Sequence, residues 1–389
     1  MLLILPDNVK KTLNTLQNSG FEAYAVGGCV RDMLMGITPH DYDVTTSALP
    51  EQVQSLFEKT IPTGIKHGTV TVIADGMPIE VTTFRTESGY SDSRRPDSVN
   101  FVTDIKADLS RRDFTTNAIA YNDNGITDPF GGINDIKSGI LRAVGEPKRR
   151  FTEDALRILR LFRFSSQLGF TIDIDTFNAA LDLSDGLQKI SRERISAELE
   201  KAVCGKNTAA LLPLISCGAL DFLSIKTPQT LEKLQNLPID CDLRLFSFFY
   251  ICRSDINQTC KELKFSNARQ QYFTDMEFLL NSAPIHTREQ IKSALKYTNI
   301  KCIKDYALIS EILNGESSEQ IITTLDDILA QNEPYLISHL AVSGNEILQL
   351  GIHGKEIGNI LEMLLSKVIK SPALNNKDAL LQIVKEYRN

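Results

Sequence analysis

The chain has 389 residues, a length that predicts two to four domains at about 100–200 residues each. Hydrophobic residues make up 42% of it and charged residues 23%, a balance that excludes a wholly disordered protein. The formal net charge of −7 argues against a protein with general affinity for nucleic acid.

Membrane and secretory segments are not expected from the sequence. No stretch approaches the roughly 18 uncharged apolar residues of a membrane span, and residues 1–6 lack the basic flank of a secretory signal. The seven cysteines show no CxxC pair and no zinc spacing. This pattern predicts reduced thiols in a soluble, cytoplasmic protein.

The predicted elements change character along the chain. The sequence predicts a helix over residues 7–18 and a short buried strand over residues 24–26. It also predicts a pair of strands, over residues 68–73 and 79–84, on either side of a turn. From about Phe151 onward, apolar residues recur at helical spacing. The sequence therefore predicts an α/β head followed by an all-helical arm.

Positive charge is concentrated near the junction of these two parts. Residues 85–163 contain 14 lysines and arginines, 11 of them arginine, against 12 acidic residues. The rest of the chain carries a net charge of −9. We therefore expect phosphate binding to be local to this segment.

The first candidate site follows the predicted strand 24–26. Gly27 and Gly28 would let the backbone approach a phosphate, although such a turn alone is more often structural. Asp41 and Asp43, two apart in a predicted strand, would aim both carboxylates to one side. Two close carboxylates repel each other unless a cation lies between them, and hard oxygen ligands suit Mg²⁺. The alternative is an exposed acidic edge.

A second candidate lies at Arg111-Arg112-Asp113, with Asn117 four residues beyond the aspartate. Arg112 could donate to a triphosphate, and Asp113 and Asn117 would share one face of a predicted helix. In the alternative interpretation, Asp113 caps the helix and pairs with Arg112.

The third candidate is the helix predicted over residues 153–163. The apolar side chains of Ala155, Ile158, Leu159 and Phe162 would face a core. Glu153, Arg157 and Arg160 would lie opposite, with Asp154 and Arg163 on the flanks. Without further context, a solvated face with i,i+4 salt bridges explains the same pattern.

Together and in this order, the patterns GG…RD, DxD, RRDFTxNA and EDALRxLRxxRF resemble the class II tRNA nucleotidyltransferases. These are the CCA-adding enzymes of the polymerase-β-like superfamily, which also contains bacterial poly(A) polymerases. The resemblance covers about residues 20–200 closely, and a tail element at residues 351–358 more loosely. It implies a mixed-sheet head with flanking helices (1–140), and an all-α neck (141–200), body (201–275) and tRNA-binding tail (276–389).

The resemblance also implies roles for nine residues. Asp41 and Asp43 would hold Mg²⁺ and serve catalysis. Asp154 and Arg157 would select the base, because a carboxylate and an arginine match the amino group and ring nitrogen of cytosine and adenine but not uracil or guanine. The remaining nucleotide contacts would be Gly28, Arg31, Arg112, Arg160 and Arg163.

The activity so implied is addition of C, C and A to the 3′ end of tRNA from CTP and ATP, by a monomer or homodimer. Residues 86–100 would form the loop that reshapes the pocket for the final A. An A-adding or CC-adding specialist and a poly(A) polymerase remain alternatives within the superfamily. A catalytically dead RNA-binding protein and a small-molecule nucleotidyltransferase are alternatives from other classes.

Overall fold

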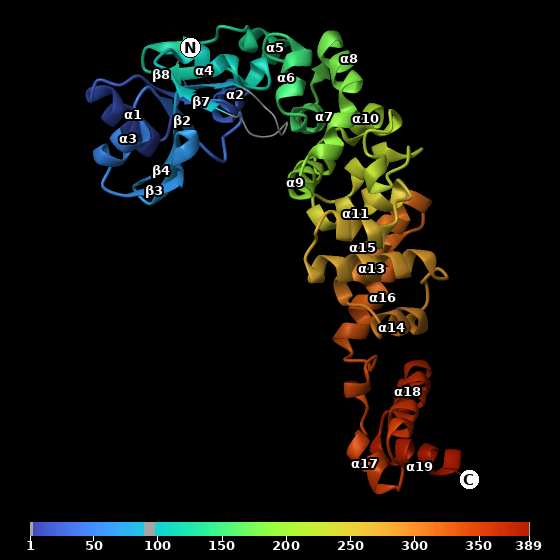
Figure 1. Cartoon of the computed structure of the whole chain (residues 1–389). Helices are drawn as coiled ribbons and strands as arrows, with labels where there is room; N and C mark the ends of the chain where they lie inside the picture. Colours follow the sequence, from blue (N-terminus) through green and yellow to red (C-terminus); the bar gives the residue numbers. More distant parts are fainter. Residues whose placement is uncertain (1–2, 89–97, 389) are drawn as a thin grey trace. The chain divides into compact units, whose positions relative to one another are not determined.

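A computed structural model describes residues 3–88 and 98–388 (Figure 1). Contacts between residues divide the chain into two compact units, Met1–Leu231 and Glu232–Asn389. Among the described residues, no helix has both the length and the apolar character needed to cross a membrane. The division into head, neck, body and tail remains a prediction.

The head is built on a mixed sheet, as the sequence predicts. In the described part of the chain it has seven strands in the order β3-β4-β5-β2-β1-β8-β9. Only the β2–β5 pair among these neighbours is parallel. The strands are β1 (Ala23–Val26), β2 (Asp43–Thr46), β3 (Thr60–Gly64), β4 (Thr69–Ala74), β5 (Met77–Thr83), β8 (Ala120–Asn122) and β9 (Gly125–Thr127).

Helices of the head cover this sheet and complete its core. The helix predicted over residues 7–18 is α1 (Asp7–Asn18), whose Val9, Leu13 and Leu16 are buried with Val44 and Val81 of the sheet. The other helices are α2 (Gly28–Leu34), α3 (Pro50–Leu56), α4 (Ile105–Ser110) and α5 (Gly132–Ser138). The predicted strand pair around Asp75–Gly76 is confirmed as β4 and β5.

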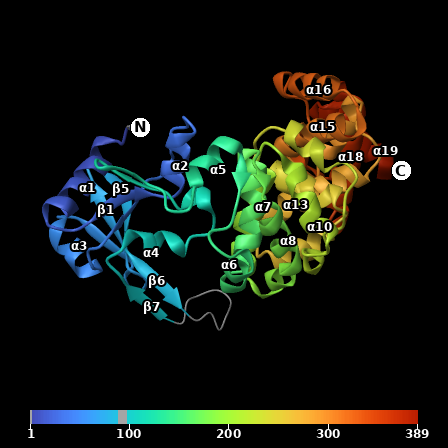
Figure 2. The ribbon, with the colours of Figure 1, turned by 90° about the horizontal axis from the view of Figure 1, so that it is seen from above.

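A separate two-stranded hairpin extends from the head. Its strands are β6 (Arg85–Ser88) and β7 (Ser98–Phe101), which pair antiparallel and lie side by side in Figure 2. These strands are the two ends of the loop predicted over residues 86–100. Residues 89–97 of that loop lie outside the described residues, so its proposed role stays a prediction.

The helical segment of the first unit follows the head directly. It contains α6 (Pro147–Glu153), α7 (Leu156–Leu168), α8 (Ile174–Asp182), α9 (Arg192–Val203) and α10 (Leu212–Ser216), with the short paired strands β10 (Ile140–Leu141) and β11 (Thr171–Ile172). Helix α7 is buried on its polar face as well as its apolar face, since Arg157 and Arg163 are 9% and 8% exposed. A solvated face is therefore wrong for this helix. The prediction of one helix over residues 153–163 is also wrong, because Glu153 ends α6, Asp154 is extended and α7 begins at Leu156.

The second unit is helical throughout the part that the structure describes, as predicted. It comprises α11 (Cys241–Ile251), α12 (Ile256–Glu262), α13 (Asn267–Asn281), α14 (Arg288–Leu295), α15 (Ile300–Asn314), α16 (Ser318–Ala330), α17 (Gly344–Gln349), α18 (Lys355–Lys370) and α19 (Lys377–Arg388). Four phenylalanines, Phe246, Phe248, Phe249 and Phe273, are completely buried around α11 and α13. Residues 340–384 form their own apolar cluster.

Candidate nucleotide-binding and catalytic site

A polar cavity of about 380 Å³ brings the three sequence motifs together in the first unit. Seven of the nine predicted site residues line it: Gly28, Arg31, Asp41, Asp43, Arg112, Arg160 and Arg163. The rest of its wall is Gly27, Cys29, Asp32, His40, Asp113, Asn117 and Phe164. Segments up to 137 residues apart in sequence, from Gly27 to Phe164, therefore converge on one pocket.

The two acidic residues of the DxD motif face this cavity from the start of β2. Strand β2 begins at Asp43, so the prediction that a strand includes Asp41 is wrong. Asp43 is exposed at the cavity, but the protein groups around it partly desolvate its carboxylate and so raise its pKa, as do Glu80 and Asp41, while Arg112 opposes the rise. Among the described residues, Asp41 and Asp43 form none of the ion pairs that engage other acidic groups of the cavity.

Gly27 allows the backbone to pass close to Arg112. Gly27 has a φ of 78°, which favours glycine, and precedes α2. A Cβ at this position would lie 3.1 Å from Nη1 of Arg112. Any side chain at Gly27 would thus strain the backbone and displace a guanidinium that lines the cavity.

The arginines on the head side are held by acidic and amide groups. Arg31 donates from Nη1 to Oδ1 of Asn117 at 2.7 Å, and from Nη2 to Oδ1 of Asp32 at 2.7 Å. Arg112 donates from Nη2 to Oδ2 of Asp108 at 3.4 Å. The alternative in which Arg112 pairs with Asp113 is therefore wrong.

Asp113 instead links the head to helix α7. The prediction that Asp113 and Asn117 lie on one α-helix is wrong. Asp113 precedes a short 3₁₀ helix that spans only Thr115–Asn117. Asn117 still donates to Oδ1 of Asp113 at 3.1 Å, and Arg160 donates from Nε and Nη2 to its Oδ2 at 2.9 and 2.6 Å. Burial favours the neutral acid, but the charge of Arg160 and these hydrogen bonds outweigh it and lower the pKa of Asp113.

Two further residues of the site were not predicted from the sequence. Glu198 on α9 is buried and contacts Nε of Arg163 at 2.5 Å and Nη1 of Arg160 at 3.6 Å. The Phe164 ring lies 3.8, 5.2 and 5.4 Å from the guanidinium carbons of Arg163, Arg31 and Arg160. The position of Phe164 directly after Arg163 was a usable signal, whereas Glu198 has no sequence neighbour in the site.

Asp154 and Arg157 lie outside the lining of this cavity. Oδ2 of Asp154 accepts from Nη2 of Arg194 at 2.8 Å. Arg157 donates to the carbonyl oxygens of Arg150 and Arg111 and to Glu153, at 3.1, 2.9 and 2.8 Å. These contacts use three of the five N–H groups of the guanidinium. Both residues are close to the cavity motifs in the sequence. In the structure, however, their side chains bond to groups that do not line the cavity.

The arrangement suits a polyanion held with a cation. Four arginines of the cavity can donate to phosphate oxygens, and two carboxylates at its wall supply hard oxygen ligands. In the residues that the structure describes, no cluster of three or more His, Cys, Asp or Glu side chains could hold a metal. A cation at Asp41 and Asp43 would therefore complete its ligands from water and substrate phosphate, the mode that Mg²⁺ prefers.

Comparison with known proteins identifies the family. A model described as "Poly A polymerase head domain" matches residues 23–142, and one described as "Probable RNA and SrmB- binding site of polymerase A" matches residues 169–230. A CCA-adding enzyme of Lactiplantibacillus plantarum is 38% identical, covering 97% of this chain and 95% of that protein. One of Staphylococcus haemolyticus is 37% identical and covers 98% of each.

The chain belongs to the family of CCA-adding enzymes. The crystal structure of the Bacillus stearothermophilus CCA-adding enzyme in complex with CTP is similar over 99% of this chain and 98% of that one, with a TM-score of 0.84 and 31% identity. The resemblance inferred from the sequence motifs is confirmed, as is the predicted fold.

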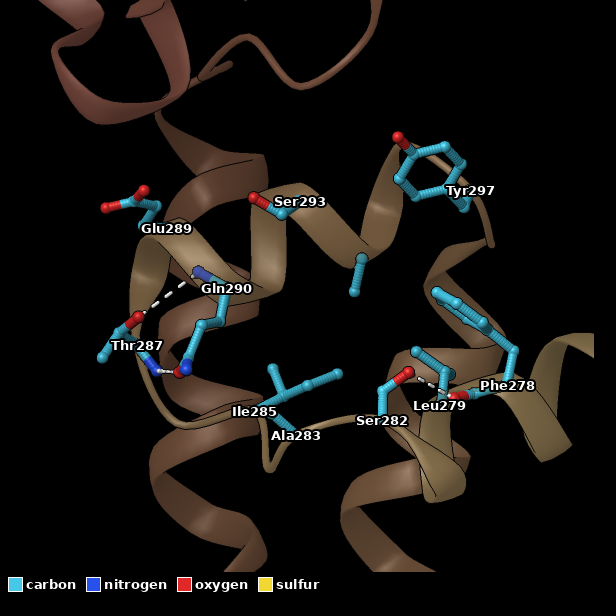
Figure 3. A pocket seen from close by; sticks show the side chains of 11 residues that line it. Phe278, Leu279, Ser282, Ala283, Ile285, Thr287, Glu289, Gln290, Ser293 and Tyr297 are labelled. Atoms are coloured by element: carbon cyan, nitrogen blue, oxygen red, sulfur yellow. Dashed lines mark hydrogen bonds between the residues drawn. The ribbon is translucent and has the colours of Figure 1, made fainter. Parts of the chain in front are cut away.

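A second cavity of about 490 Å³ lies apart from these motifs, in the second unit between α13 and α14 (Figure 3). Figure 3 shows Thr287 and Gln290 joined by the capping contacts that begin α14, with the rings of Phe278 and Tyr297 across the hollow. Its lining contains one charged residue, Glu289. This apolar cavity therefore lacks the acidic pair and the arginines found in the polar cavity of the first unit.

We predict that Asp113→Asn destabilises the protein by about 2 kcal/mol at neutral pH, because it removes the closer of the two carboxylates that pair with Arg160. The pKa of Asp113 in the folded protein lies below the ordinary value of 3.8. Its contribution is therefore complete above that value and is lost as the pH falls toward the folded pKa. Urea unfolding of both proteins between pH 8 and 3 should show a difference that shrinks below about pH 4. A pH-independent difference would contradict the ionic role.

Proposed function

We propose that the chain adds C, C and A to the 3′ end of tRNA, using CTP and ATP and releasing pyrophosphate. The observation that carries this proposal is a polar cavity lined by four arginines and by Asp41 and Asp43, for which the described residues show no ion pair. Relatives named CCA-adding enzymes are similar to the chain over nearly its whole length, which supports the same activity here.

We propose Asp41 and Asp43 as ligands of Mg²⁺. Both carboxylates line the cavity, and their oxygens suit this ion. When bound, such a metal ion lowers the pKa of the RNA 3′-hydroxyl and neutralises charge on the leaving pyrophosphate. Arg31, Arg112, Arg160 and Arg163 would orient the triphosphate, and the backbone at Gly28 would contact it.

We propose that Asp154 and Arg157 select the base. A carboxylate accepts from the amino group of cytosine or adenine, while an arginine donates to the adjacent ring nitrogen. Arg157 retains N–H groups beyond the three contacts described above. Asp154 is paired with Arg194, but a carboxylate can accept several hydrogen bonds and would serve both partners.

The alternatives within the superfamily differ in product. An A-adding specialist would act only on tRNA that already ends in CC, a CC-adding enzyme would stop before A, and a poly(A) polymerase would extend RNA with many A residues. Product length and composition distinguish all four activities.

The function is tested with a tRNA transcript lacking its 3′ end, Mg²⁺, and labelled CTP and ATP separately or together. We expect exactly three nucleotides to be added when both are present, and two with CTP alone. Asp43→Asn should abolish incorporation of both CMP and AMP, since it removes a proposed metal ligand, while tRNA binding measured by filter retention stays near wild type. Near-normal turnover by this variant would show that the metal assignment is wrong.

Base selection is tested by Asp154→Asn, which keeps the shape but adds a donor that could serve O4 of uracil. The preference for CTP over UTP should fall by at least ~10-fold, the scale of one hydrogen bond gained or lost in a buried site. Competition between labelled CTP and UTP on one tRNA measures the ratio.

Arg194→Gln is the matched control, because it breaks the same ion pair but keeps the Asp154 carboxylate. Its preference for CTP should stay near wild type. An unchanged ratio in Asp154→Asn, or equal falls in both variants, would mean that Asp154 serves the structure and does not contact the base.

A further inference from the structure

Arg111 lies where the β6–β7 hairpin, helix α4 and the helical segment meet. It immediately precedes Arg112, which lines the polar cavity, but Arg111 itself does not line it. Its guanidinium and its backbone carbonyl point to different neighbours. These neighbours are Glu87 of the hairpin, Asp108 of helix α4 and Arg157, for which a role in base selection is proposed.

The side chain of Arg111 joins the hairpin to helix α4. Its Nη1 donates to Oε1 of Glu87 on β6 at 3.1 Å. Its Nε and Nη2 donate to Oδ1 of Asp108 at 3.0 and 2.9 Å. The Glu87 and Asp108 side chains are only 8% and 0% exposed, so these charge-assisted bonds are little screened by water.

Glu87 also receives a hydrogen bond from the hairpin itself. Nε of Arg85 donates to the same Oε1 at 2.9 Å. Glu87 is paired in register with Val99 of β7. One buried carboxylate therefore connects strand β6 to Arg111, and β6 is in turn paired with β7.

The backbone of the same segment holds the proposed base-selecting arginine. The carbonyl oxygen of Arg111 accepts from Nη2 of Arg157 at 2.9 Å. The preceding carbonyl, that of Ser110, accepts from Nη1 of Arg150 at 3.2 Å. Because Arg157 also bonds to the carbonyl of Arg150, a shift of residues 110–111 would move Arg157 through two contacts.

Asp108 extends this connection to the cavity. Its second oxygen, Oδ2, accepts from Nη2 of Arg112 at 3.4 Å. The charges of Arg111 and Arg112 outweigh the effect of burial and lower the pKa of Asp108, so it remains ionised. The Asp108 carboxylate therefore holds both Arg111, which contacts the hairpin, and Arg112, which lines the cavity.

We propose that Glu87 is a positioning residue for nucleotide selection, acting through Arg111 on both Arg157 and Arg112. Glu87 does not line the cavity, so its effect on the nucleotide is indirect. The proposal rests on the base-selecting role proposed above for Arg157. It makes the root of the hairpin part of the selection apparatus.

The test replaces Glu87 by Gln, which preserves shape but removes the charge that holds Arg111. We expect the ratio of CMP to UMP incorporation, measured by competition on one tRNA, to fall by about 5-fold or more, and KM for CTP to rise. The ratio does not depend on the fraction of active protein, so a purely structural defect leaves it unchanged. Glu22→Gln, at an exposed glutamate that accepts from Tyr24, is the control and should retain the wild-type ratio.

A second variant set separates this proposal from the one on which it rests. Arg157→Lys should itself lower the CMP to UMP ratio, and adding Glu87→Gln to it should have little further effect. If Arg157→Lys lowers the ratio and Glu87→Gln does not, the positioning role is wrong and the role of Arg157 stands. If Arg157→Lys leaves the ratio unchanged, the selecting role of Arg157 fails and the positioning role fails with it.

Discussion

The geometry of the polar cavity depends on ion pairs, because each of its four arginines pairs with a carboxylate. Arg31 pairs with Asp32, Arg112 with Asp108, Arg160 with Asp113 and Arg163 with Glu198. Four guanidinium groups around one small cavity would otherwise repel each other and leave no fixed geometry. The carboxylates come from α2, α4, the turn after α4, and α9, so the pairs also join the head to the helical segment. Asp113 is central, because it connects Arg160 to Asn117 and through it to Arg31.

Much of this was predictable from the sequence, because the residues proposed to contact phosphate, metal and base occur in short motifs. Helix α1 and the strands β1, β4 and β5 follow from apolar spacing and glycine turns. The glycine pair and the DxD carboxylates required only local chemistry to be recognised as candidates. The family resemblance then linked motifs that composition and periodicity could not have joined.

The remainder depends on tertiary contacts that sequence spacing does not record. Arg160 pairs with Asp113 across 47 residues, and Glu198 reaches Arg163 from another helix. Helical spacing wrongly placed Asp113 and Asn117 on one α-helix, although their side chains do meet. The charged residues of α7 led to the interpretation that this face is solvated. Periodicity separates charged from apolar residues, but it does not show whether a charged side chain is in solvent or buried against a partner. Arg157 is an example, because it is buried and donates to two backbone carbonyls that the sequence pattern does not reveal.

The most direct test of the paired arrangement is a double-mutant cycle on CTP binding with Asp113→Asn and Arg160→Gln, measured by calorimetry in the presence of Mg²⁺. If Asp113 acts by holding Arg160, Asp113→Asn alone should weaken binding by ~10-fold, and much less when Arg160 is already replaced, a coupling of at least about 1 kcal/mol. Effects that add to within about 0.5 kcal/mol would show that the two residues act independently and would contradict this account.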